Sequence, residues 1–226
     1  MNKLRNMRNF KLAAISALFL AFASAATIAD AEDAKPLYEN NFENAEVGKV
    51  PEDFLVLDGA FEVKQENGNK FLELPGAPLD TFSLLFGPTS KSDVAVSARI
   101  NGTTHGRRSP TFAVGLNGQG GYRLQISPAK KALEIFKGDD SLASVPFEWK
   151  SGEWTTLKLQ VSKAGAVWKI EGKAWTQGSP EPKQAMISYD ETKDPTPGRA
   201  SIWGSPFSTT PIQYDDLMVK SVEPAK

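Results

Sequence analysis

The stretch VAVSARINGTTHGRRSPTFAVGLNGQGGYRLQI, residues 94–126, decides the fold. Apolar side chains take every second position in three runs within it. These positions are Val94, Val96, Ala98, Ile100, Phe112, Val114, Leu116, Tyr122, Leu124 and Ile126. Successive side chains of a β-strand point to opposite faces, so this period of two predicts three strands with one buried face each. Asn117-Gly118 and Gly120-Gly121 separate the last two runs and supply the positive-φ residues that a hairpin requires.

The same alternation continues to the end of the chain. It recurs at Leu133 and Ile135, at Thr155, Leu157, Leu159 and Val161, at Trp168 and Ile170, and at Ile212 and Tyr214. Short strands separated by turn signals predict an all-β fold of two packed antiparallel sheets. Residues 181–192 are the one place after residue 31 where a helix is conceivable, and Pro182 opposes it.

The first 31 residues look like an export signal. Lys3, Arg5, Arg8 and Lys11 precede an apolar run with small-residue cleavage sites before Ala26 and Glu32, as in a secretory signal peptide. An uncleaved membrane anchor is the alternative, but the run is at the short end of what spans a bilayer. We therefore expect an extracytoplasmic bacterial protein, periplasmic or secreted, with no transmembrane segment after cleavage.

Composition limits what the remaining chain can do. Residues 32–226 hold 22 basic and 26 acidic side chains, a net charge of −4 that makes nucleic acid an unsuitable partner. There is no cysteine, so neither a disulfide nor a lipid-modified cysteine is available. No linker or internal repeat divides these residues, which predicts one sandwich domain held together by its core.

Three short motifs resemble a known group of domains. They are Asn41-Phe42-Glu43 followed by Gly48 and Pro51, the central GGYRLQ at 120–125, and the closing GRASIWG at 198–204 with IQYDDL at 212–217. Together they resemble the concanavalin-like jelly-roll domains, in particular the 3-keto-disaccharide hydrolase family and other laminin-G-like or laminarinase-like modules of exported bacterial proteins. The resemblance covers residues 37–222 and implies a two-sheet jelly roll with its first and last strands side by side.

This arrangement suggests a calcium site. After Tyr214 the apolar face resumes at Leu217, one residue out of phase, which predicts a bulge at Asp215-Asp216. If the segment at 41–43 lies beside residues 212–219, Asn41, Glu43 and Asp215 can converge, and calcium accepts such carboxylate and amide oxygens. The alternative is that these residues only end strands and solvate turns.

The sequence offers few catalytic residues. Laminarinase-like enzymes carry paired carboxylates on one strand, but no E-x-D-x-x-E run is present. The strand glutamates stand singly and are expected on a solvated face; they are Glu62, Glu73, Glu134 and Glu171. A serine triad built on Ser109 and His105 lacks a nucleophile elbow, and a zinc site would depend on carboxylates.

A binding surface is the remaining candidate. Arg99, Arg123 and Gln125 occupy the polar phase of two central strands, so we expect them on a shared face, where the alternative is a plain solvent-facing sheet. The loop at 101–110 carries His105, Arg107 and Arg108 and should form a rim at one end of the sandwich, where binding residues commonly lie. Trp203 is a candidate stacking platform for a sugar ring.

Three functions fit these observations. The first is a non-catalytic exported β-sandwich that binds carbohydrate, such as a cell-envelope glycan, or another extracellular ligand. The second is a glycoside-cleaving enzyme resembling the 3-keto-disaccharide hydrolases, and the third is a structural or cell-surface interaction domain. The lack of recognisable catalytic residues favours the first.

Overall fold

The computed structural model describes residues 36–78, 80–207 and 210–224. The expected signal peptide and both of its cleavage sites lie outside these residues. In the part of the chain that is described, no helix is long and apolar enough to cross a membrane.

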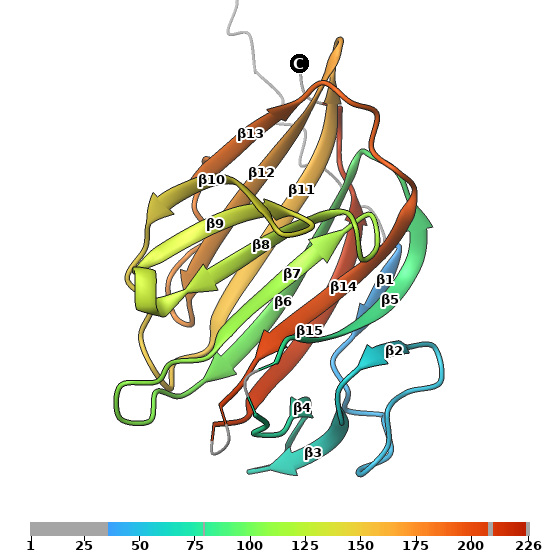
Figure 1. The fold of residues 1–226 in the computed structure, drawn as a ribbon. Helices are drawn as coiled ribbons and strands as arrows, with labels where there is room; N and C mark the ends of the chain where they lie inside the picture. Colours follow the sequence, from blue (N-terminus) through green and yellow to red (C-terminus); the bar gives the residue numbers. More distant parts are fainter. Residues whose placement is uncertain (1–35, 79, 208–209, 225–226) are drawn as a thin grey trace, which may run out of the picture. The chain divides into compact units, whose positions relative to one another are not determined.

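The described residues form two antiparallel sheets that pack face to face (Figure 1). The eight-stranded sheet has the order β13-β12-β11-β6-β15-β4-β3, and β1 also pairs with β15. Its strands are β1 (Tyr38–Asn40), β3 (Glu62–Glu66), β4 (Asn69–Leu74), β6 (Val94–Gly102), β11 (Thr155–Ala164), β12 (Val167–Thr176), β13 (Ile187–Glu191) and β15 (Ile212–Ser221). The predicted all-β sandwich with jelly-roll architecture is thereby confirmed.

The seven-stranded sheet has the order β10-β9-β8-β7-β14-β5-β2. Its strands are β2 (Leu55–Asp58), β5 (Phe82–Ser90), β7 (Thr111–Leu116), β8 (Tyr122–Ser127), β9 (Ala132–Lys137), β10 (Asp140–Pro146) and β14 (Gly198–Ser205). The short turn η1 (Pro128–Lys130) joins β8 to β9. The segment at 181–192, where a helix was conceivable, contains strand β13 instead.

The core lies between the sheets and uses the predicted apolar phase of each strand. Val96, Ile100, Val114, Leu124 and Leu159 are all fully buried there. Close packing leaves no room for a side chain at some positions. At Gly204, for example, an added Cβ would collide with the hydroxyl of Tyr214 and lie 2.9 Å from the side chains of Ile212 and Leu74.

The two ends of the chain meet as the sequence predicts. Tyr38 pairs with Val219 and Asn40 with Leu217, so β1 lies beside the second half of β15. The register of β15 shifts after Asp215, where Asp216 has a φ of +49°, which confirms the bulge. The pairing ends at Asn40, however, so the expectation that residues 41–43 themselves pair beside residues 212–219 is wrong.

Candidate functional site

The predicted ligand residues are divided between the two sheets. Arg99 points outward from β6 in the eight-stranded sheet, whereas Arg123 and Gln125 point outward from β8 in the seven-stranded sheet. The expectation of one shared face is therefore wrong. Alternation along a strand fixes which side chains point outward, but not which sheet the strand joins, and the loop between β6 and β7 carries the chain from one sheet to the other.

Arg123 lies between two aromatic rings on the outer face of the seven-stranded sheet. The guanidinium carbon is 4.9 Å from the centre of the Trp203 ring and 5.1 Å from that of Phe136. We call this surface, formed by Arg123, Gln125, Phe136 and Trp203, the Arg123 face. The sequence predicts Arg123, Gln125 and Trp203 as ligand-binding residues. Phe136 is the member of this face that sequence reasoning missed.

Small residues on β7 make room for this stack. Gly115 pairs with Arg123 on one side and Ser201 on the other, and Ala113 lies between Gln125 and Trp203. A Cβ at Gly115 would lie 3.2 Å from Trp203 Nε1 and collide with Ser201 Oγ. That indole nitrogen donates a 2.8 Å hydrogen bond to Ser201 Oγ, so the glycine allows the ring to be held in place.

Asp139 is the acidic residue whose charge acts on Arg123, but no side chain in the described part of the chain forms an ion pair with the guanidinium. Its guanidinium also makes no hydrogen bond among the described residues, and its buried Nε has no hydrogen-bond partner. Burial lowers the pKa of Arg123, and the charge of Asp139 opposes that change. An arginine stays protonated at neutral pH even so, which leaves a cation with unused donors on this face.

Two further polar pairs line the same face. Gln125 donates from Nε2 to Ser127 Oγ at 2.9 Å, which fixes the plane of its amide. Glu134 points outward beside Gln125 but is only 3% exposed, and Lys130 pairs with it at 3.1 Å. The expectation that Glu134 is solvated is therefore wrong, although its outward direction is as predicted.

The loop with the single histidine is exposed at one end of the sheets. His105 and Arg108 exchange backbone hydrogen bonds of 2.9 and 3.1 Å around Gly106, and the guanidinium carbon of Arg108 lies 6.0 Å from the Phe207 ring. Arg107 is also exposed. Ser109 is 3.0 Å from the hydroxyl of Thr104 rather than engaged with His105, so the structure places no serine triad here.

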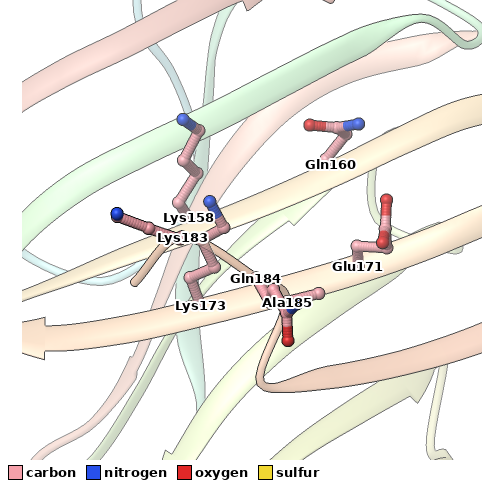
Figure 2. A pocket seen from close by; sticks show the side chains of 7 residues that line it. All are labelled: Lys158, Gln160, Glu171, Lys173, Lys183, Gln184 and Ala185. Carbon is pink, nitrogen blue, oxygen red and sulfur yellow. The ribbon is translucent and has the colours of Figure 1, made fainter. Parts of the chain in front are cut away.

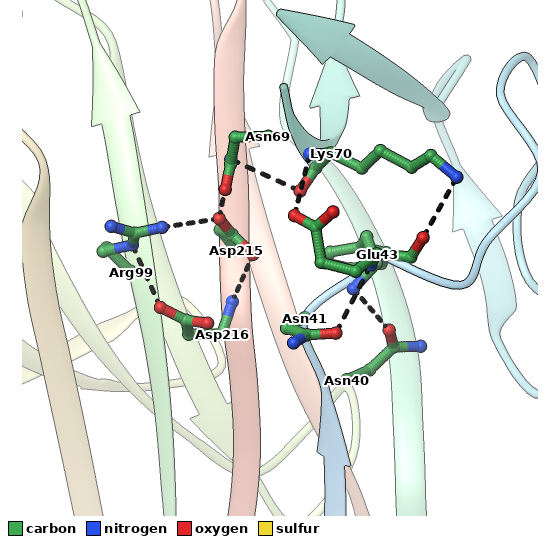
Figure 3. A network of polar contacts seen from close by, with 9 residues as sticks. Asn40, Asn41, Glu43, Asn69, Lys70, Arg99, Asp215 and Asp216 are labelled. Carbon is green, nitrogen blue, oxygen red and sulfur yellow. Dashed lines mark hydrogen bonds and ion pairs between the residues drawn. The ribbon is translucent and has the colours of Figure 1, made fainter. Parts of the chain in front are cut away.

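Arg99 belongs to a different network, shown in Figure 3. Asp215 is 1% exposed and accepts from Arg99 Nη2 at 2.6 Å, from Asn69 Nδ2 at 3.0 Å and from the Asp216 amide at 2.8 Å. Arg99 Nε also lies 3.1 Å from Asp216 Oδ2, and its guanidinium covers the ring of Trp154 at 4.7 Å. Burial and the charge of Asp215 raise the pKa of Asp216.

This network changes the case for calcium. The expectation was that Asn41, Glu43 and Asp215 converge and offer their oxygens to calcium, but Asp215 already accepts from Arg99 and Asn69. Glu43 accepts from the Lys70 amide at 3.1 Å, and Asn41 accepts from the Glu43 amide at 3.3 Å. Within the described ranges no cluster of three or more acidic or histidine side chains is arranged to hold a metal, so calcium stays a prediction.

A hollow of about 290 Å³ lies over β11 and β12 (Figure 2). Lys158 and Lys173 line it, and they pair with Glu181 at 2.9 and 2.8 Å. Burial alone would raise the pKa of Glu181, but the two ammonium groups lower it. We interpret these ion pairs as structural contacts that hold the segment before β13 against the sheet, rather than as part of a ligand site.

Comparison with known proteins supports the fold. No family model matches the chain, and no curated protein matches its sequence. A solved Bacillus subtilis protein of unknown function with a galectin-like fold aligns with a TM-score of 0.59 at 11% identity, covering 86% of this chain and 99% of that one. The carbohydrate-binding module CBM66 from Bacillus subtilis aligns with a TM-score of 0.53 at 13% identity, covering 75% and 96%.

A seed lectin from Lotus tetragonolobus gives a TM-score of 0.53 at 11% identity, covering 83% of this chain and 99% of the lectin. At such identities the likeness shows the fold alone. None of these findings supports the resemblance to the 3-keto-disaccharide hydrolase family. The domain has the lectin-like, concanavalin-like jelly-roll fold.

Proposed function

We propose that this domain is a non-catalytic module that binds carbohydrate through the Arg123 face and works outside the cytoplasm. One observation carries the proposal: the guanidinium of Arg123 lies between Phe136 and Trp203 and donates no hydrogen bond to any residue that the structure describes. A sugar presents C–H groups that pack on aromatic rings and hydroxyls that pair with planar polar groups. The face supplies both kinds of contact.

Two further facts support this choice. The amide of Gln125 has a fixed plane on the same face, so the polar groups are held before a ligand arrives. The solved proteins of the same fold include a carbohydrate-binding module and a seed lectin. Glu134, the nearest carboxylate in register, is buried against Lys130, which disfavours an acid–base role.

We expect Trp203→Ala and Arg123→Gln each to weaken glycan binding about tenfold or more, because each removes a stacking or donor contact of about 1–2 kcal/mol. A glycan array on the purified protein identifies the ligand, and calorimetry then measures affinity. Lys169→Ala, a change on the outer face of the other sheet, is the matched control. Wild-type affinity in both face variants, with intact melting curves, would contradict the proposal.

For the two arginines of the loop we expect a smaller effect on glycan affinity. If Arg107 and Arg108 form a rim, changing both to alanine should weaken binding of the same glycan about threefold and leave the melting temperature unchanged, since both side chains are exposed. Calorimetric titration of the double variant and of the wild type with this glycan measures the difference in affinity. Identical affinities would show that the loop takes no part in binding.

A further inference from the structure

Another hollow lies on the eight-stranded sheet, opposite the Arg123 face, and has the composition of a binding site. Gln213 on β15 pairs with Glu73 on one side and Asn101 on the other, and all three point outward. Trp154 lies just before β11, across from Asn101 on β6, and its backbone carbonyl accepts a hydrogen bond from the Gln177 amide at 2.8 Å. These strand ends surround a hollow of about 460 Å³, which we call the Asn101 hollow; its lining includes Asn69, Arg99, Asn101, Trp154, Gln177 and Gln213.

The aromatic wall of this hollow is held rigidly. Trp154 has the guanidinium of Arg99 against its ring at 4.7 Å and the ring of Phe71 edge-on at 6.3 Å. Arg99 is itself fixed by Asp215, and Phe71 is only 3% exposed. A wall that does not need to be ordered on binding costs little entropy when a ligand packs against it.

One residue that lines the hollow carries a polar atom without a hydrogen-bond partner among the described residues. Asn101 Oδ1 is buried and has no hydrogen-bond partner among the described residues. A buried acceptor left unpaired costs about 1–3 kcal/mol relative to a paired one. The amides of Gln213 and Gln177 border the same space, so a ligand that donates to Asn101 would also meet planar donors and acceptors.

The charges decide which ligand class fits. Arg99 is the cation of the hollow, and it is committed to Asp215 and Asp216. Unlike Arg123, it therefore has no charge left for an anion, and Glu66 at the border adds a negative charge. We propose that the Asn101 hollow is a second carbohydrate site, specific for a neutral sugar, on the sheet opposite the Arg123 face.

The test follows the side-chain amide signals of Gln213 and Asn101 by ¹H–¹⁵N NMR during titration with maltose, cellobiose and sucrose, and with glucuronate as the anionic probe. A neutral sugar should shift both signals, and glucuronate should shift them less. Trp203→Ala should leave these shifts unchanged, because that residue lies on the other sheet. This separates the second site from the proposed function.

Asn101→Ala should reduce the shift of the Gln213 signal about tenfold at equal sugar concentration. The melting temperature of this variant should not fall, because Asn101 Oδ1 has no hydrogen bond to any described residue that the change would remove. Gln160→Ala, an outward change elsewhere on the same sheet, should keep the wild-type response. The inference is overturned if no neutral sugar shifts either signal, if glucuronate acts more strongly, or if the Asn101→Ala protein responds like the wild type.

Discussion

Replacing Arg99 with methionine should lower the free energy of unfolding by about 3 kcal/mol. The change keeps most of the side chain's apolar volume beside Trp154 but removes the guanidinium that neutralises Asp215, whose side chain is 2% exposed. Only the uncharged donors of Asn69 and the Asp216 amide then remain. A buried charge that loses its partner is far more costly than an exposed pair that is broken. Urea unfolding followed by tryptophan fluorescence measures the loss.

Two further variants separate the lost ion pair from lost packing. Asp215→Leu added to Arg99→Met should recover most of the stability, because no unpaired charge remains buried. Lys158 lies on β11, the strand beside β6, and Lys158→Met is the matched control. It breaks the more exposed pair with Glu181 and should cost less than about 1 kcal/mol of unfolding free energy. If Arg99→Met lowers the free energy of unfolding no more than Lys158→Met does, Arg99 does not stabilise the buried carboxylate of Asp215 as we expect.

The sequence predicts much of this sandwich because burial follows a period of two. Leu133 and Ile135 on β9 point inward. The same alternation predicts that Phe136 points outward, so this part of the Arg123 face could also have been predicted from the sequence. The bulge at Asp215-Asp216 was also readable, because a single residue moves the apolar phase to the next position.

The pairing of strands could not be read in the same way. Arg99 and Asp215 are 116 residues apart, and Arg123 and Trp203 come from strands that only the sheet order brings near each other. Nothing in the local pattern shows that Arg99 pairs with two acidic side chains while Arg123 forms no ion pair with any described residue. This difference in charge pairing assigns the two arginines to different roles, and it depends entirely on tertiary structure.

A second long-range pair makes stability depend on pH. Glu191, at the end of β13, accepts from Lys137 Nζ at 2.7 Å, from the Tyr122 hydroxyl at 3.1 Å and from the Lys193 amide at 2.8 Å. Burial alone would raise the pKa of Glu191, but these donors lower it to about 2 from an ordinary value of 4.5. The ionised form is therefore stabilised in the folded state more than in the unfolded chain.

Because this pKa is depressed on folding, the stabilisation by Glu191 should be complete above pH 4.5 and should disappear as the pH falls toward about 2. We expect Glu191→Gln to cost about 2 kcal/mol at neutral pH and to lose that difference from the wild type in acid. Urea unfolding of both proteins across this range measures the difference, and comparison at each pH cancels the other carboxylates. Glu181→Gln, whose pair with Lys158 is more exposed, should show a smaller gap. A constant gap between the wild type and Glu191→Gln at every pH would mean that the variant loses packing rather than a charged hydrogen-bond acceptor.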